Sequence, residues 1–171
     1  VLKVKKKNIN DNNFIDHKSY KQPLTICFEG YINNRSLVIA YFLGHLTGLT
    51  GGSIAAKTIS AGESKVYLTF WQVFFSAVGC NWLVGMAVWL NFAAKDVGSK
   101  MFGVWFPIMT FVAIGFQHLV ANMFAIPAAM FEGANISVLQ FIQNMGTVFL
   151  GNFVGAVTLV SAYTHLLTKN K

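Results

Sequence analysis

A histidine stands near the middle of a long apolar stretch, residues 101–131. At about 1.5 Å of rise per helical residue, His118 lies close to the centre of a bilayer. Phe111 and Asn122 stand seven residues before it and four after it, so a continuous helix would put all three on one face, with Gln117 adjacent. A side chain that titrates near neutral pH suits a proton relay. The alternative is a histidine that bonds a neighbouring helix while no solute passes it.

Other polar side chains fall at matching depth in further apolar stretches. His45 is at the centre of the first, Asn81 is at the centre of the second, and Asn144 and Asn152 lie in the fourth. Because an unpaired polar group in lipid is costly, each of these side chains requires a partner or a role. Their common depth favours a lined pathway over a set of unrelated structural bonds.

The spacing does not support a metal centre or a covalent catalyst. His45, His118 and Cys80 are the metal-ligating types at this depth, but they form no HxxxH or CxxC pair. No serine or cysteine nucleophile stands beside a base. We therefore expect no metal, no other cofactor and no enzymatic activity.

Lys65 is a cation just before the second apolar stretch, on the predicted outer face of the membrane. A positive charge there raises the local concentration of an anionic solute. The alternative is a lysine whose stem lies along apolar surface while its ammonium group reaches the lipid headgroups.

The composition shows which elements must position these residues. Hydrophobic residues make up 54% of the 171 residues and charged residues 11%, against about 25% charged in soluble domains. This excludes a soluble enzyme, a disordered chain and a disulfide scaffold. Residues 1–35 form a basic polar tail, and 36–168 form the predicted membrane domain. Its four expected spans are 36–56, 66–94, 101–131 and 136–167.

The last three spans are longer than a straight crossing needs. Each should therefore tilt, extend past the bilayer or break inside it. Gly115, Pro107 and Pro127 are the places where the third span can bend or unwind. An unwound stretch at this depth is tolerated where it lines a cavity.

Basic residues in the loops set the expected orientation. Alternate connections carry eleven Lys and Arg on one side and two on the other. By the positive-inside rule, both termini are cytoplasmic. Although the net charge is +7, the lysines of the tail stand beside asparagines with few aromatics. A solvated or headgroup-facing tail is therefore favoured over binding to nucleic acid.

The first and fourth spans share a short pattern. LGHLTG at 43–48 and LGNFVG at 150–155 both place two glycines four residues apart. One interpretation is close helix packing in lipid. The other is an internal repeat, in which spans two to four form a three-helix unit and span one ends a second unit whose first two helices are absent.

Longer blocks carry a family resemblance. CNWLVGMAVWLNFAAKD at 80–96 and FPIMTFVAIGFQHLVANMFAIPAAMF at 106–131 closely resemble the formate/nitrite transporter family, and the match covers about residues 36–168. The resemblance implies an all-α, aquaporin-like bundle with inverted three-helix repeats, here truncated to about four transmembrane helices. It also implies a homopentamer in the plasma membrane that passes small monovalent anions such as formate, nitrite, lactate or hydrosulfide, often with a proton.

The resemblance also implies roles for single residues. His118 resembles the central pore histidine, Asn122 follows it in the same block, and Phe111 resembles an apolar constriction. Asn81 and Asn152 resemble pore-side asparagines, and Lys65 resembles the family's lysine ahead of its fourth helix.

This chain departs from the family pattern in three ways. Gln117 stands where the family usually has Glu, and His45 stands where it usually has Asn, which puts a second titratable group near the path. Family members have six helices, of which this chain is expected to carry the third to the sixth. The alternative function is therefore a truncated membrane fragment or packing subunit that transports nothing.

Overall fold

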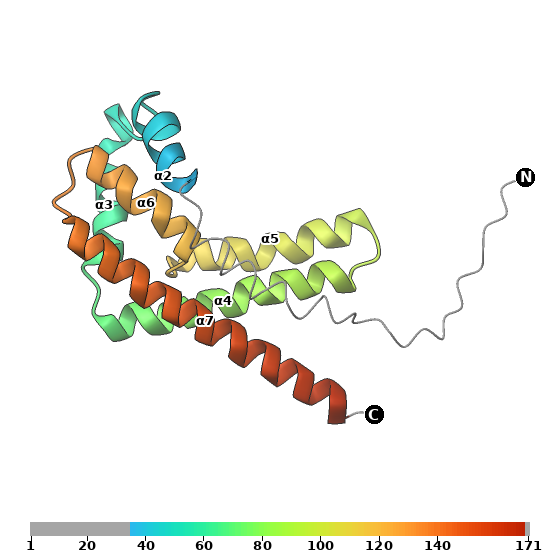
Figure 1. Ribbon diagram of the computed structural model, residues 1–171. Helices are drawn as coiled ribbons and strands as arrows, with labels where there is room; N and C mark the ends of the chain where they lie inside the picture. The colour runs from blue at the N-terminus through green and yellow to red at the C-terminus, as the bar shows by residue number, and fades with distance from the viewer. Residues whose placement is uncertain (1–34, 170–171) are drawn as a thin grey trace, which may run out of the picture.

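The computed structural model describes residues 35–169, whose regular elements are all helical (Figure 1). The predicted polar tail, apart from its last residue, lies outside this range. Along the chain the elements are α2 (Arg35–Ile39), the π-helical η1 (Ala40–His45), the 3-10 turn η2 (Gly52–Ile54), α3 (Ala55–Val66), α4 (Phe70–Ala93), α5 (Val97–Ile114), α6 (Leu119–Phe131) and α7 (Val138–Lys169).

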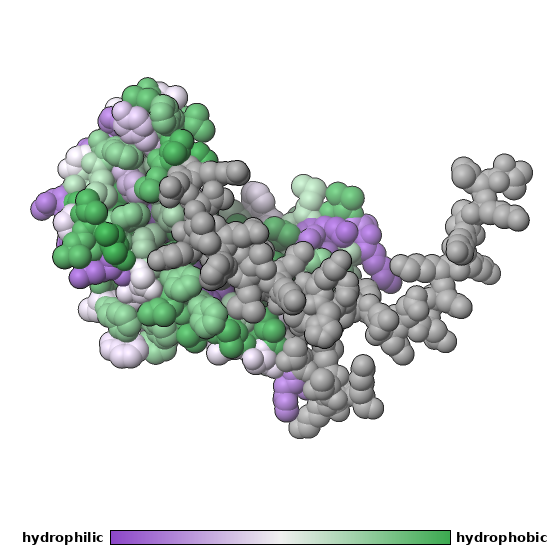
Figure 2. Space-filling model, in the orientation of Figure 1, coloured by the Kyte–Doolittle hydropathy of each residue, from purple (hydrophilic) through white to green (hydrophobic). Residues whose placement is uncertain are grey.

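Three of the helices are long and apolar enough to cross a membrane. They are α4, α5 and the Val138–Ala162 part of α7, while Ser36–His45 and α6 are shorter apolar helices. The second and fourth predicted spans therefore correspond to single helices, α4 and α7. Figure 2 shows apolar side chains over much of the visible face, with hydrophilic ones gathered where α4 joins α5.

The predicted span 36–56 does not form one continuous helix. Helix η1 ends at His45, and a turn separates it from η2 and α3. Gly48 and Gly52 have φ of 73° and 57°, values that interrupt a right-handed helix and that glycine adopts without a steric penalty. The predicted connection 57–65 is also wrong, because these residues belong to α3.

The third predicted span consists of two helices. Gly115 ends α5 in the left-handed conformation, with φ 79° and ψ 25°. His118 then adopts an extended conformation as the N-cap of α6. This agrees with the expectation of a bend or break near Gly115, but the halves do not continue one helical face.

Side-chain caps fix where α4 and α5 begin. Thr69 and Gln72 form a reciprocal capping box at the start of α4. Asp96 precedes α5 and accepts the backbone N–H of Ser99 at 2.9 Å and its hydroxyl at 2.6 Å. These hydrogen bonds favour the carboxylate and lower the pKa of Asp96.

Helix α4 packs against both α5 and α7, and α3 packs against α6. On α7, a Cβ added at Gly151 would lie 2.6 Å from the carbonyl oxygen of Phe74, and one at Gly155 would lie 2.6 Å from that of Val78. The two glycines therefore allow α7 to approach the backbone of α4.

The matching glycines of the first span, Gly44 and Gly48, do not bring two helices together. Gly44 faces Thr50, and Gly48 lies in the turn after η1 with open space where a Cβ would be. The two copies of the shared pattern therefore do not have the same conformation. Close helix packing describes the second copy, 150–155, and a chain turn describes the first.

Candidate functional site

The break between α5 and α6 brings together most of the residues singled out in the sequence. Four residues, 115–118, leave the regular helix. The chain turns here through backbone bonds from Gly115 N to Val112 O at 3.1 Å and from Phe116 N to Phe111 O at 3.0 Å. The carbonyls of Gly115 and Phe116 then point away from their own helix and need donors from another element.

Lys65 supplies those donors. Its Nζ donates to the carbonyl oxygens of Gly115 at 2.9 Å and Phe116 at 3.1 Å. Because the C-terminal end of a helix is partly negative, a cation there stabilises the end of α5. Lys65 is half-buried near the end of α3, and its ammonium group bonds this break.

His118 begins α6 on the other side of the break. Its Nδ1 accepts the backbone N–H of Ala121 at 3.4 Å. Its ring stacks on that of Phe111 with centroids 5.5 Å apart. The predicted proximity of Phe111 and His118 is therefore found, but the reason is the turn between α5 and α6 and not a common helix face. Asn122 lies one turn further on and donates its backbone N–H to the carbonyl of His118.

Three buried side-chain amides, those of Gln117, Asn122 and Asn144, form hydrogen bonds in and beside the break. Asn122 Nδ2 donates to Gln117 Oε1 at 2.5 Å and to Asn144 Oδ1 at 3.0 Å. Gln117 Nε2 and Asn144 Nδ2 both donate to the backbone carbonyl of Lys65, at 3.4 and 2.8 Å. Asn122 Oδ1 has no hydrogen-bond partner within the range the structure describes. The amides therefore join α3, α6 and α7 around the break.

Two more asparagines fasten the same region to α4 and α7. Asn152 Oδ1 accepts the backbone N–H of Leu119 at 3.1 Å, and its Nδ2 donates to the carbonyl oxygen of Ala77 at 2.8 Å. Asn81 Nδ2 donates to the carbonyl of Asn152 at 2.6 Å. Both asparagines are buried. They bond backbone groups, including the first N–H of α6, which the helix itself leaves unpaired.

Ser76 is a residue of the site that the sequence analysis missed. Its hydroxyl accepts the backbone N–H of Gln117 at 3.0 Å. A serine inside the apolar α4 could have indicated a polar contact at this depth. Its partner could not be inferred, because Gln117 is 41 residues away along the chain.

The structure does not place His45 in the middle of a long helix, as its position in the predicted span 36–56 implied. It ends η1, and its Nδ1 is 3.0 Å from Glu132 Oε1. Thr50 Oγ1 donates to the same carboxylate oxygen at 2.9 Å. The hydrogen bonds from His45 and then from Thr50 lower the pKa of Glu132. His45 therefore belongs to a cluster at the C-terminal end of α6, whereas His118 is at its N-terminal end.

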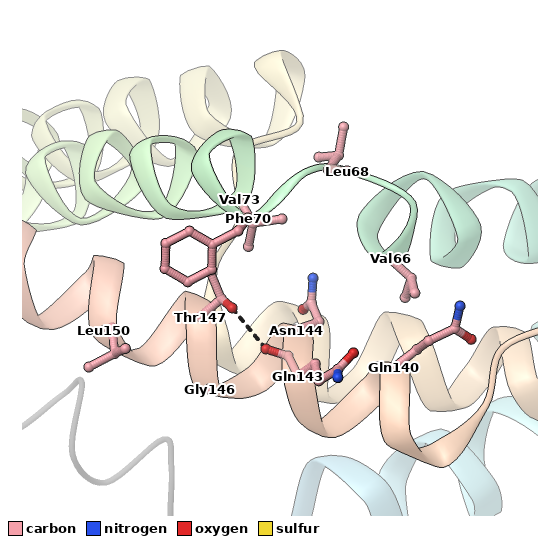
Figure 3. A pocket seen from close by; sticks show the side chains of 10 residues that line it. All are labelled: Val66, Leu68, Phe70, Val73, Gln140, Gln143, Asn144, Gly146, Thr147 and Leu150. Atoms are coloured by element: carbon pink, nitrogen blue, oxygen red, sulfur yellow. Dashed lines mark hydrogen bonds between the residues drawn. The ribbon is translucent and has the colours of Figure 1, made fainter.

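A cavity of about 520 Å³ lies beside the amides, between α7 and the connection from α3 to α4. Figure 3 shows Asn144 of α7 and Val66 of α3 both pointing into it. Its lining is amide and hydroxyl on the α7 side and apolar on the other: Val66, Leu68, Phe70, Val73, Gln140, Gln143, Asn144, Gly146, Thr147 and Leu150. Asn144 therefore connects the buried amides to an open space.

Comparisons with known proteins agree on one family. Residues 18–166 match the family model described as formate/nitrite transporter. The chain is 53% identical over 126 residues to the uncharacterized transporter YrhG of Bacillus subtilis, covering 73% of this chain and 47% of that protein. It is 42% identical over 125 residues to the formate channel BtFdhC of Bacillus thuringiensis, covering 73% and 48%. Both are named as transport proteins and neither as an enzyme.

A solved structure is also similar. It is described as a pentameric formate channel with formate bound, and it superposes with a TM-score of 0.70 at 28% identity, covering 78% of this chain and 60% of that one. The chain spans about half the length of the curated relatives that it matches.

Proposed function

Because the chain belongs to the formate/nitrite transporter family and is an integral membrane protein, we propose that it carries small monovalent anions of the formate type across the membrane together with a proton. The observation that carries this proposal is the pair of Lys65 and His118 at one helix break. A fixed cation and a titratable ring next to the same break can handle an anion and a proton in one place.

Lys65 has two functions in this proposal. Its Nζ bonds two carbonyls of the break, and a lysine ammonium has three donors. Two hydrogen bonds therefore hold the turn, and the positive charge also attracts an anion. A neutral residue without a donor, such as methionine, would lose both effects at this position.

Phe111 and His118 together determine which protonation form of the solute passes. An apolar ring beside the path penalises a bare charge because it offers no hydrogen bond. Formate that gains a proton becomes formic acid, which is neutral and passes an apolar ring at much lower cost. The sequence resemblance implies the same constriction role for Phe111.

His118 is suited to supply that proton. In the neutral ring, the bond from Ala121 to Nδ1 leaves the ring proton on Nε2. The ring takes up one further proton and gives it to the anion, forming the neutral acid. The ring is then neutral again, and its Nδ1 accepts the N–H of Ala121 once the remaining ring proton is on Nε2. No net change of the protein remains after one cycle.

We also propose the assembly and the orientation. The similar solved structure is a pentameric formate channel, which supports a homopentamer in which each protomer, built on inverted repeats, has its own pore. The excess of lysine and arginine in the N-terminal tail, beside the α4–α5 connection and after residue 167 supports cytoplasmic termini, and we propose the plasma membrane as the location. Nitrite, lactate and hydrosulfide are further candidate anions because each is small and carries a single negative charge.

The test is uptake of labelled formate by proteoliposomes that contain the full-length protein. Uptake should saturate and should be faster at about pH 6 than at about pH 8, because more of the histidine is protonated. Labelled nitrite and lactate measured in parallel rank the anions. Uptake no faster than that of empty liposomes at both pH values would refute the proposal.

A further inference from the structure

We propose that Gln117 determines the anion affinity of this site. Because an amide does not ionise, residue 117 adds no pH-dependent charge to the site. An amide at this position leaves the charge of Lys65 without a carboxylate from the described residues, so that a bound monovalent anion supplies the countercharge. This inference rests on the proposed function and deepens it, because it names the residue that sets the binding of the anion.

The first observation is the surroundings of Lys65. Its Nζ bonds the carbonyls of Gly115 and Phe116, which are dipoles and carry no full negative charge. Among the described residues, the ion pair is that of His45 with Glu132, and Lys65 has no carboxylate partner.

The other two acids of the described range are also placed elsewhere. Glu63 is two residues before Lys65 on α3, and residues two apart on a helix do not face each other. Asp96 caps the opposite end of α5 from the break. Within the described range, the ammonium of Lys65 therefore bonds carbonyl dipoles and no carboxylate.

The second observation is the place of Gln117. It directly follows the carbonyl of Phe116 that binds Lys65 Nζ, and its side chain is fully buried. Its Nε2 donates to the carbonyl of Lys65, and its Oε1 accepts from Asn122. An amide makes both bonds without a charge, whereas an ionised carboxylate can only accept.

A carboxylate at position 117 would change the charge of the site without changing its shape. Glutamate has the same length as glutamine, so the packing is kept, although an ionised carboxylate cannot donate to the Lys65 carbonyl as Nε2 does. Residue 117 directly follows the carbonyl that binds Lys65 Nζ, and its side chain contacts the Lys65 backbone. Inside a protein, where the dielectric constant is low, opposite charges this close along the chain attract strongly even without direct contact. The carboxylate would therefore compete with a solute anion for Lys65, but only while it is ionised.

The experiment compares Gln117→Glu with Gln117→Met in the full-length protein. Formate uptake and equilibrium binding of labelled formate are measured from about pH 5 to about pH 8, each relative to wild type at the same pH. In Gln117→Glu, the KM and the dissociation constant should rise about tenfold at high pH and return toward wild type at low pH. Gln117→Met removes the hydrogen bonds without adding a charge, so it should lower the maximal rate and leave the pH profile of KM unchanged.

Two results would overturn the inference. One is a Gln117→Glu protein whose KM follows wild type at every pH, and the other is an equal, pH-independent loss of affinity in both variants. The binding measurement separates this inference from the proposed function. If the wild type binds formate but carries none, transport is refuted while the pH-dependent loss of binding in Gln117→Glu still tests the role of Gln117.

Discussion

His118 combines a structural bond with a group that can exchange protons. Its Nδ1 caps α6 by accepting from Ala121, and its ring stacks on Phe111. A phenyl ring can keep the stacking but can neither cap the helix nor carry a proton. The effect of removing the imidazole on transport should therefore far exceed its effect on folding, because a lost cap costs only about 1 kcal/mol.

We predict that His118→Phe abolishes proton-linked formate uptake by the full-length protein. General acid–base groups contribute about a hundredfold or more to the steps they assist, so uptake should fall to background at about pH 6. His165→Phe is the control, because His165 is an exposed histidine near the end of α7. Proteoliposome uptake measures both, and unchanged uptake in His118→Phe would contradict the role of the histidine.

The chemical types of the site residues could be predicted from the sequence, but most of their contacts could not. His118, Asn122 and Lys65 stand out because polar groups are rare in apolar stretches. Yet Lys65 Nζ bonds carbonyls 50 and 51 residues away. No periodicity encodes such a contact, because it depends on how α3 packs beside the break.

At the scale of helices, α7 packs closely on α4 because two glycines of α7 have no side chain at the contact. Gly151 and Gly155 let α7 approach the carbonyls of Phe74 and Val78. Gly146 lies earlier on the same helix, and a Cβ added there would meet nothing within 4 Å. The same substitution should therefore destabilise the protein at Gly151 and not at Gly146.

We predict that Gly151→Ala destabilises the protein by about 1–3 kcal/mol or more, the usual cost of overpacking. Its Cβ would lie 2.6 Å from both Ala77 Cβ and Phe74 O, and a backbone atom cannot move aside cheaply. Gly146→Ala should be neutral or stabilising by about 0.5–1 kcal/mol, since alanine favours a helix interior. Thermal unfolding in detergent measures both, and equal shifts in the two variants would refute this account of the packing.

The two helix breaks differ in how readily the sequence indicates them. The break at Gly115 is predictable, because a long span contains glycine between two prolines. The break after His45 is not, because the run 36–56 has the length and composition of one span. Its glycines resemble packing positions, whereas Gly48 and Gly52 have positive φ. Glycine serves both purposes, and composition alone does not separate them.

At the scale of the whole molecule, α6 joins two polar clusters. At its N-terminal end are His118 and the buried amides, and at its C-terminal end Glu132 binds His45 and Thr50. Thr50 lies in the turn between η1 and η2, and it bonds Glu132 at the end of α6. The second cluster therefore holds this turn against α6. Ionisation of Glu132 therefore contributes to the packing of η1 and the turn after it on α6.

The pKa of Glu132 predicts how this packing responds to acid. Hydrogen bonds in the folded protein lower that pKa, so the stabilisation is complete above the usual glutamate value of about 4.3 and is lost as the pH falls through the lowered value. Glu132→Gln should lower the melting temperature at neutral pH and flatten its decline in acid. Glu63→Gln, which removes a carboxylate outside the cluster, should keep the wild-type profile. An unchanged acid profile in Glu132→Gln would show that this cluster does not couple α6 to the turn.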